Sequence, residues 1–398
     1  MITKFGTLYA GHVDLGDTGI SGTPVNDRSL TNERLVSVFD KATAIAELMD
    51  RTGYDTFWLA EHHFQREGYE CIPNILMLAV HLALKTKNIK IGCGFNITPM
   101  WHPLRLAEDY ATADVLTEGR VVFGIGRGYH TREVETFGMP LIDQDANREL
   151  FEEQVDIIFK AFNESSFSHK GPNYTIPPDV EYRGYDLEEI TLVPRPLTLP
   201  VECYQPIVSG SERALDFMVK HGIKGLIGGG AAAGGASSPA VAGWRAALAR
   251  GGRETEPGTD LIIGVSFHIA DTEKEAIEQA RPYFEENMKM FGALHMVRGL
   301  DDSQIDALGD PIRAPGAGLP TLEDAVEAGG WLCGPAELVT EKLMALQERC
   351  PGLEEVNAGS VIGTPQSVIT EQLQRFAEDV MPHFKTGSTS KSEADATA

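Results

Sequence analysis

Short apolar runs alternate with longer amphipathic segments along most of this 398-residue chain. Eight runs have the length and composition of β-strands, and most of them precede a segment with helical periodicity. The expected strands cover residues 2–9, 56–61, 89–97, 120–125, 202–208, 225–227, 262–269 and 355–360. The clearest expected helices are one that Asn32 caps and Gly53 ends, and those at 74–85, 104–116 and 147–162.

This alternation predicts a parallel sheet that is covered by helices. An open doubly wound sheet and a closed eight-fold barrel both fit the pattern. The count of eight strands and the absence of a linker in mid-chain favour the barrel. We therefore expect a single (β/α)8 TIM barrel over residues 1–385, followed by a short, polar and disordered tail at 386–398.

The net charge of −24 limits the partners that this chain can attract. Such a charge repels nucleic acid and anionic membranes, so an anionic cofactor must be held by a few local arginines and backbone amides. The five cysteines are scattered and form no CxxC pair, which argues against a disulfide framework or a zinc cluster. With no signal-peptide pattern and no apolar run long enough to cross a bilayer, we expect a soluble cytoplasmic protein.

Three segments are expected to be irregular. Residues 11–29 follow the first strand, residues 228–238 are almost entirely glycine, alanine and serine, and residues 299–330 are rich in glycine and proline. In a barrel, loops after strands form the mouth of the active site. We expect 228–238 to be mobile, 299–330 to act as a lid, and 11–29 together with 299–330 to select the substrate.

The segment TFWLAEHHF (56–64) places Glu61, His62 and His63 at the end of a strand. In a barrel this position faces the active-site mouth. Because neighbouring strand residues point to opposite faces, the two histidines are not expected to form a metal pair, and no metal is expected. The alternative interpretation is a capped strand end with one surface histidine.

Two further segments join strands to helices. In CGFNITPMWHP (93–103), Trp101 and His102 combine an aromatic ring with a group that can carry protons. In GIGRGYHTREVETFG (124–138), Tyr129 occupies the place of the last glycine of a dinucleotide fingerprint, so that motif fails. The glycines would instead let a flat ligand approach, with Arg127 facing a phosphate, unless Arg127 is only a surface residue.

The segment IVSGSERAL (207–215) offers small hydroxyl residues between a strand and a helix. Ser209, Ser211 and nearby backbone amides can bind an anion at a helix N-terminus. Simple capping of the helix by Ser211 explains the pattern equally well.

Taken in order, FWLAEHHF, PMWHPLRLAEDYATADVLTEGR and FGIGRGYHTREVETFG resemble the bacterial-luciferase-like flavin-dependent monooxygenases. The resemblance is tight over residues 53–140, looser through Ser209, and returns in FAEDVMPHF near the C-terminus. It implies a (β/α)8 barrel that forms a homodimer. It also implies that a separate NAD(P)H:flavin reductase supplies reduced FMN, which is used with O2 to oxygenate a small organic substrate.

The resemblance also assigns roles to the candidate residues. His62, next to Glu61, falls on the active-site histidine, and a neutral imidazole with a pKa of about 6.5 would act as general base or as a group that accepts and returns protons. Glu61 and His102 are the other catalytic candidates, and Trp101 and Tyr129 would shape the substrate side. The flavin-binding positions, with a non-proline cis peptide expected between residues 94 and 95, fall on Cys93, Gly94, Phe95, Asn96, Arg127, Arg148, Ser209, Gly210 and Ser211.

The sequence departs from luciferase itself at two positions. Gly126 replaces a reactive cysteine, and Trp101 replaces a small residue before a histidine, which argues against long-chain aldehyde oxidation with light emission. Three alternatives remain open: a dehydrogenase or reductase that uses a reduced deazaflavin, a non-catalytic flavin carrier, and a metal-dependent barrel hydrolase. The missing His-x-His pattern disfavours the hydrolase.

Overall fold

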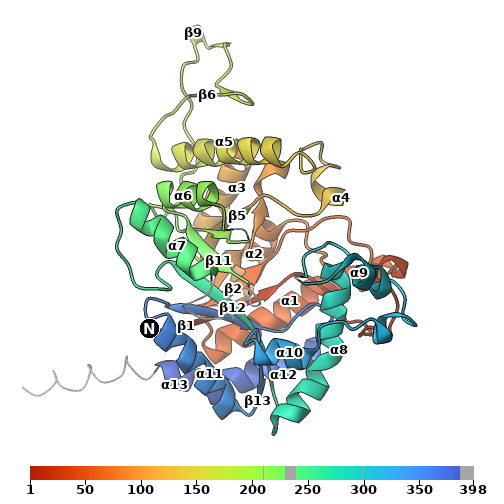
Figure 1. The fold of residues 1–398 in the computed structure, drawn as a ribbon. Coiled ribbons are helices and arrows are strands. Elements are labelled where there is room, and N and C mark those ends of the chain that lie inside the picture. The colour runs from red at the N-terminus through yellow and green to blue at the C-terminus, as the bar shows by residue number, and fades with distance from the viewer. Residues whose placement is uncertain (209, 229–238, 298, 386–398) are drawn as a thin grey trace, which may run out of the picture.

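The computed structural model describes residues 1–208, 210–228, 239–297 and 299–385. Among them, eight parallel strands close into a barrel in which β5 pairs with β10 and β14 returns to β1 (Figure 1). The predicted barrel is confirmed. In order around the ring, its strands are β1 (Lys4–Tyr9), β2 (Thr56–Leu59), β3 (Lys90–Cys93), β5 (Val121–Gly126), β10 (Cys203–Pro206), β11 (Lys224–Ile227), β12 (Leu261–Ile269) and β14 (Glu355–Gly359).

Helices cover the outside of the barrel (Figure 1). The longer ones are α1 (Asn32–Thr52), α2 (Ile75–Lys85), α3 (Pro103–Leu116), α5 (Gln144–Asn163), α6 (Glu212–Lys220), α7 (Pro239–Arg250), α8 (Glu273–Gly292), α11 (Ala336–Arg349) and α12 (Gln366–Arg375). The shorter ones are α4 (Thr131–Val134), α9 (Asp302–Leu308), α10 (Leu322–Glu327), α13 (Pro382–Lys385), the 3-10 turns η1 (Val25–Asp27), η2 (Thr98–Met100) and η4 (Ala314–Gly316), and the π-helical η5 (Phe376–Val380).

The barrel strands are buried on both faces, as expected for parallel strands beneath helices. Every residue of β2 and β5 is buried. A cluster that includes Trp58, Tyr204 and Leu226 packs together, with Phe95 against it. Gly92 is required by this packing, because a Cβ atom there would lie 2.4 Å from the Trp58 ring.

Local signals placed the early helices correctly. α1 begins at Asn32, but its N-cap residue is Thr31, so the predicted capping role of Asn32 is wrong. Gly53 ends α1 in the left-handed conformation, as expected of a C-terminal glycine. Asn74 caps α2 by accepting a hydrogen bond from the backbone N–H of Met77.

The expectation of an irregular segment at 299–330 is wrong, because this segment contains α9, η4 and α10. β13 (Trp331–Gly334) follows and pairs in parallel with β12 outside the barrel ring. β4 (Asn96–Ile97) pairs with β5 just beyond β3. The segments 229–238 and 386–398, expected to be mobile and disordered, lie outside the described residues.

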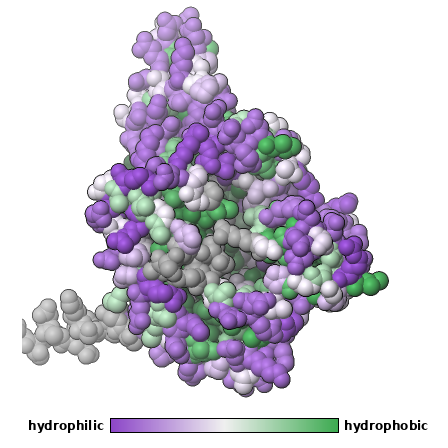
Figure 2. Space-filling model, in the orientation of Figure 1, coloured by the Kyte–Doolittle hydropathy of each residue, from purple (hydrophilic) through white to green (hydrophobic). Residues whose placement is uncertain are grey.

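Between α5 and β10 the chain forms an arm that the sequence did not predict. It carries two antiparallel hairpins, and it projects beyond α5 with a largely hydrophilic surface (Figures 1 and 2). At its base, the Glu153 carboxylate accepts hydrogen bonds from Asn173 and from the backbone N–H of Tyr174. The strands of the arm are β6 (His169–Lys170), β7 (Thr175–Ile176), β8 (Glu181–Tyr182) and β9 (Tyr185–Asp186).

Ion pairs fasten the loop at 11–29, which is irregular as predicted apart from η1. The Arg28 guanidinium lies 2.7 Å from the Asp17 carboxylate and 3.1 Å from that of Glu286 on α8. Lys41 of α1 lies 2.8 Å from the Asp14 carboxylate. These contacts hold the loop against the mouth of the barrel. None of the helices in the described ranges is long and apolar enough to cross a membrane.

A buried carboxyl group inside the barrel yields a stability prediction. Glu355 of β14 accepts a hydrogen bond from the Trp58 indole, and burial raises its pKa from 4.5 to about 6. Because the folded state favours the protonated form, the stability that this group contributes at low pH is lost as the pH rises through about 6. Glu355→Gln should therefore raise the free energy of unfolding at pH 7.5 by about 2 kcal/mol.

Urea denaturation at pH 5 and pH 7.5 measures this effect. Glu354→Gln is the matched control, because Glu354 is exposed and pairs only with Lys4 at the surface. Equal pH dependence of stability in the two variants would contradict the assignment to Glu355.

Candidate active site

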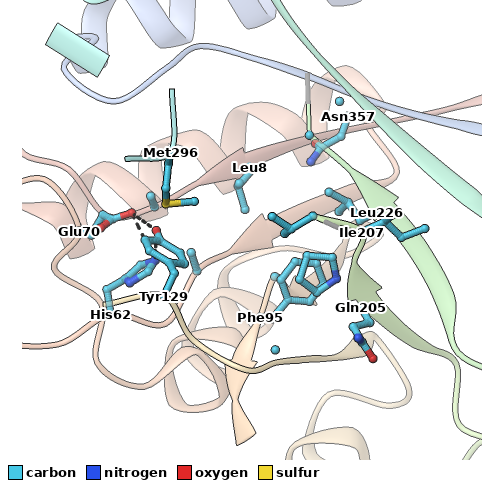
Figure 3. Close-up of a pocket in the computed structure, with 18 of the residues that line it drawn as sticks. Leu8, His62, Glu70, Phe95, Tyr129, Gln205, Ile207, Leu226, Met296 and Asn357 are labelled. Atoms are coloured by element: carbon cyan, nitrogen blue, oxygen red, sulfur yellow. Dashed lines mark hydrogen bonds and ion pairs between the residues drawn. The ribbon is translucent and has the colours of Figure 1, made fainter. Parts of the chain in front are cut away.

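A cavity of about 460 Å3 opens at the carboxyl ends of the barrel strands. Apolar side chains form much of its wall, among them Leu8, Phe95, Ile207, Leu226 and Met296 (Figure 3). Apolar atoms also appear in the recessed middle of the face in Figure 2. This is the mouth at which the predicted site residues were expected to meet.

His62 stands at the centre of a buried polar cluster in this cavity and is only 4% exposed. Its Nδ1 atom lies 3.3 Å from the Glu133 carboxylate at the end of α4. Its Nε2 atom lies 3.1 Å from the Tyr129 hydroxyl and 3.3 Å from the Glu70 carboxylate. Figure 3 shows His62, Tyr129 and Glu70 together on one side of the cavity.

The hydrogen bonds determine where the protons of this cluster lie. A carboxylate only accepts, so the Tyr129 hydroxyl donates to Glu70 at 2.7 Å, and its oxygen accepts from His62 Nε2. His62 Nδ1 likewise donates to Glu133. In this pattern both ring nitrogens of His62 act as donors, an arrangement that favours the imidazolium over the neutral ring.

Electrostatics agree with this protonation state. Burial opposes the charge, but the carboxylates of Glu70 and Glu133 outweigh it and raise the pKa of His62 above 6.5. Burial also opposes the charge of Glu133, whose pKa is nonetheless lowered by the hydrogen bond from His62. The expectation of an unperturbed pKa is thus wrong: these surroundings favour the charged form of His62, which has a proton to give up.

Glu70 and Glu133 were missed by the sequence analysis. Both are 1% exposed, and Glu70 also accepts a hydrogen bond from His130 at 2.8 Å. Glu70 lies in the loop after β2 and Glu133 on the short helix α4 after β5, and a single acidic residue in such a segment carries no sequence signal of its own. Gly68 at a positive φ, close behind His62, could have hinted that this loop folds back tightly.

Glu61 lies in the cavity wall and orders its surroundings. Its carboxylate accepts hydrogen bonds from the Trp101 indole at 2.9 Å and from the backbone N–H of Ile97 at 2.8 Å, and lies 3.1 Å from His63 Nε2. Trp101 is therefore turned toward Glu61 and is not part of the cavity wall. Glu61 fixes the loop after β3 relative to the end of β2.

His102 is placed away from the cavity. Its side chain caps α3 by accepting a hydrogen bond from the backbone N–H of Leu104, and its ring packs edge-on against Tyr174 at the base of the arm. This position does not suit the expected catalytic role. The adjacency of Trp101 and His102 suggested a shared role in catalysis. The sequence does not show the loop geometry that separates the two side chains.

The segment after β3 has the expected backbone. The peptide bond between Gly94 and Phe95 is cis, and both residues line the cavity. Cys93 and Asn96 are buried and point elsewhere, and the Asn96 amide donates to the Gly124 carbonyl. Two of the four predicted residues therefore face the cavity, and Asn96 instead ties the segment after β3 to β5.

Two arginines give the cavity a positive patch. Arg127 and Arg148 both line it, and Arg127 donates a hydrogen bond to Asn147 at 3.0 Å. Burial and the nearby positive charge of Arg148 lower the pKa of Arg127. The Glu152 carboxylate, 3.9 Å from Arg148, offsets part of this positive charge, and the remainder favours an anion beside the two arginines.

The predicted serine loop is only partly described. Ser209 lies outside the described residues, and Gly210 is exposed. Ser211 caps α6 by accepting a hydrogen bond from the backbone N–H of Ala214, which matches the simpler of the two alternatives for this residue. The cavity wall nearby includes Val208 and Ala214.

Two amide side chains in the cavity wall were not predicted. Gln205 of β10 and Asn357 of β14 are both mostly buried and line the cavity (Figure 3). Each has a side-chain oxygen without a hydrogen-bond partner in the described part of the chain. Buried amides of this kind suit a ligand with a polar edge, since an unmet buried polar group is costly.

Potential metal ligands also meet in the cluster. Donor atoms of His62, Glu70 and His130 lie within 4.8 Å of one another. The hydrogen bonds among these side chains and Tyr129 account for this closeness without an ion.

Comparison with known proteins was made with this geometry in hand. A family model for luciferase-like monooxygenases matches residues 7–351. Limonene 1,2-monooxygenase of Rhodococcus erythropolis is 24% identical over 345 residues, which cover 85% of this chain and 80% of that protein. The oxygenase component of the flavin-dependent trigonelline monooxygenase of Acinetobacter baylyi is 28% identical over 163 residues, or 41% of each chain.

For the first three curated relatives, the chain covers only 39%, 41% and 37% of the relative's own length. Solved structures share the fold over nearly the whole chain. One is the FMN-bound oxygenating constituent of 3,6-diketocamphane monooxygenase from Pseudomonas putida, with a TM-score of 0.71, 19% identity and coverage of 96% and 99%. Another is an F420-dependent secondary alcohol dehydrogenase, with a TM-score of 0.64, 15% identity and the same coverage. On the family match, which covers most of its length, this chain belongs to the luciferase-like monooxygenases.

Proposed function

We propose that this protein is a flavin-dependent monooxygenase that binds reduced FMN and oxygenates a small organic substrate with O2. Family membership supports the reaction class, and the relatives named above include flavin-dependent monooxygenases. The observation that carries the proposal is one cavity that combines an arginine pair, an apolar wall and a buried imidazolium.

The residues of the cavity fit FMN in three ways. Arg127 and Arg148 would hold the phosphate, supplying locally the positive charge that the acidic chain lacks overall. Phe95 and its apolar neighbours would contact the flat ring system. The free amide oxygens of Gln205 and Asn357 would meet the polar edge of the ring.

When bound, reduced FMN supplies two electrons to O2, so that one oxygen atom enters the substrate and the other leaves as water. The chain's own part is to exclude water, orient the substrate and control protons. His62 would give up a proton on its Tyr129 side and keep its Nδ1 proton on Glu133. Glu61 would keep the flavin-side loop in place through Trp101 and Ile97.

The remaining partners are proposed on the same basis. A separate NAD(P)H:flavin reductase would supply reduced FMN, and two copies of the chain would form a homodimer, both as expected from the family resemblance. Size-exclusion chromatography with light scattering tests the dimer. A reduced deazaflavin remains the second candidate cofactor, because the F420-dependent dehydrogenase shares this fold.

Removal of one arginine should weaken flavin binding before it affects chemistry. Arg127→Ala removes a charge-assisted contact with the phosphate, which is worth about 1.5–3 kcal/mol and so about 10- to 100-fold in the dissociation constant. Anaerobic titration with reduced FMN measures the change. Arg105→Ala, an exposed arginine on α3, is the control and should bind like the wild type. Equal affinity in both variants would contradict phosphate binding at Arg127.

Loss of the His62 imidazole should affect product formation and leave flavin binding unchanged. His62→Ala should bind reduced FMN normally and lose product formation by about 10²- to 10⁴-fold, the usual contribution of a proton-transfer group. Product is detected as 18O incorporated from 18O2 into a panel of limonene, trigonelline, a camphor diketone and an n-alkanal. His102→Ala should retain wild-type product formation, since His102 lies outside the cavity. Normal turnover by His62→Ala would remove His62 from the mechanism.

A further inference from the structure

Tyr129 is the member of the buried cluster that is most open to the cavity. It is 36% exposed, whereas His62 is 4% exposed and Glu70 is 1% exposed. All three line the cavity, and Figure 3 shows Tyr129 beside the other two. A ligand that enters this end of the cavity therefore meets the tyrosine most readily.

The hydrogen bonds leave His62 without a proton that points freely into the cavity. Its Nδ1 proton is held by Glu133, and its Nε2 proton lies between the Tyr129 oxygen at 3.1 Å and the Glu70 carboxylate at 3.3 Å. The Tyr129 hydroxyl is in turn held by Glu70, whose second oxygen is bound by His130. These hydrogen bonds thus form a chain from His62 through Tyr129 to Glu70, and His130 holds Glu70 in place.

We propose that Tyr129 is a catalytic residue that passes protons from His62 to an oxygen atom of the bound ligand, and that Glu70 is the positioning residue that holds Tyr129 in this chain. The proposal rests on the proposed function, in which His62 is the source of the proton. In this proposal Tyr129, and not His62, contacts the reacting atoms directly.

The proton transfer balances as follows. When a ligand oxygen develops negative charge, the Tyr129 hydroxyl turns from Glu70 toward it, and the Tyr129 O–H bond breaks as the ligand O–H bond forms. The His62 Nε2–H bond then breaks and restores the Tyr129 hydroxyl. His62 is left neutral, with its remaining proton on Nδ1 against Glu133, and regains the second proton from solvent.

The titratable groups nearest His62 are three carboxylates and the His130 ring, whose centroid lies 5.2 Å from that of His62. Glu70 comes from the loop after β2, Glu133 from α4, and Glu61 from the end of β2. Removal of either Glu70 or Glu133 should make His62 lose its proton at a lower pH, but only Glu70 also holds Tyr129. A comparison of Glu70 and Glu133 variants therefore distinguishes an effect on the charge of His62 from an effect on the position of Tyr129.

The first test uses reduced FMN and O2 without an organic substrate. The monoanion of reduced FMN, O2 and one proton give oxidised FMN and H2O2, so release of H2O2 requires a proton from the protein or solvent. Stopped-flow measurement should show Tyr129→Phe slower than wild type by at least about 100-fold, with unchanged FMN affinity. Tyr174→Phe removes a tyrosine hydroxyl outside the cavity and should react like the wild type.

Two further variants sharpen this test. Residues that act in the same proton-transfer chain have non-additive effects on the reaction rate. The double variant His62→Gln with Tyr129→Phe should therefore be no slower than the slower single variant. Glu70→Gln should slow H2O2 release more than Glu133→Gln does, and Glu70→Asp should recover part of the loss. If Tyr129→Phe reacts at the wild-type rate while His62→Gln is slow, His62 acts directly and the proposal is overturned.

The second test needs no flavin. With 15N-labelled histidine, the NMR spectrum of the free protein should show both His62 nitrogens protonated at neutral pH. Tyr129→Phe should shift the Nε2 signal and leave the Nδ1 signal in place. Glu70→Gln should lower the pH midpoint of His62, and Glu70→Asp should restore it. An unchanged Nε2 signal in Tyr129→Phe would overturn the proton chain. Failure of the wild type to bind reduced FMN would instead overturn the proposed function.

Discussion

The arrangement of the site depends on how three buried carboxylates find partners. Glu61, Glu70 and Glu133 are each 1% exposed at the mouth of the barrel. A buried charge without a partner costs several kcal/mol, so each carboxylate must be matched by donors. The donors are His62, Tyr129 and His130 for two of them, and the Trp101 indole with a backbone amide for the third. Satisfying these groups fixes the loops after β2, β3 and β5 relative to one another.

The barrel makes this arrangement possible because it brings the ends of non-adjacent strands together. Glu61 follows β2 and Tyr129 follows β5, and both line one cavity with Gln205 of β10 and Asn357 of β14. The same cavity contains two arginines that suit an anion and the His62, Tyr129 and Glu70 cluster, which can transfer protons. A negatively charged cofactor and a proton-dependent reaction can therefore be accommodated together, although the chain as a whole repels anions.

The sequence predicted the barrel well because each of its eight strands is a distinct apolar run. It also predicted His62, Gly94, Phe95 and Arg127 in the cavity wall, since these lie in segments that resemble a known family. It did not predict Glu70, Glu133, Gln205 or Asn357.

Glu70, Gln205 and Asn357 line the cavity, and Glu133 contacts His62 behind its wall, only because separate loops and strands converge there. No local sequence pattern records that convergence. His102 was misplaced for the same reason. Its side chain turns back to cap α3, a choice made by the loop geometry. The helices within 299–330 were missed because glycine and proline residues obscured two short capped turns, which begin after Asp301 and Thr321.

The central claim is that the cavity binds reduced FMN for reaction with O2. The most direct measurement is an anaerobic competition titration in which reduced FMN and a reduced deazaflavin are offered to the same protein, followed by admission of O2. The account predicts that reduced FMN binds more tightly and is consumed by O2 while bound. Selective binding of the reduced deazaflavin, with no reaction with O2, would contradict the monooxygenase proposal and indicate hydride transfer on the same barrel.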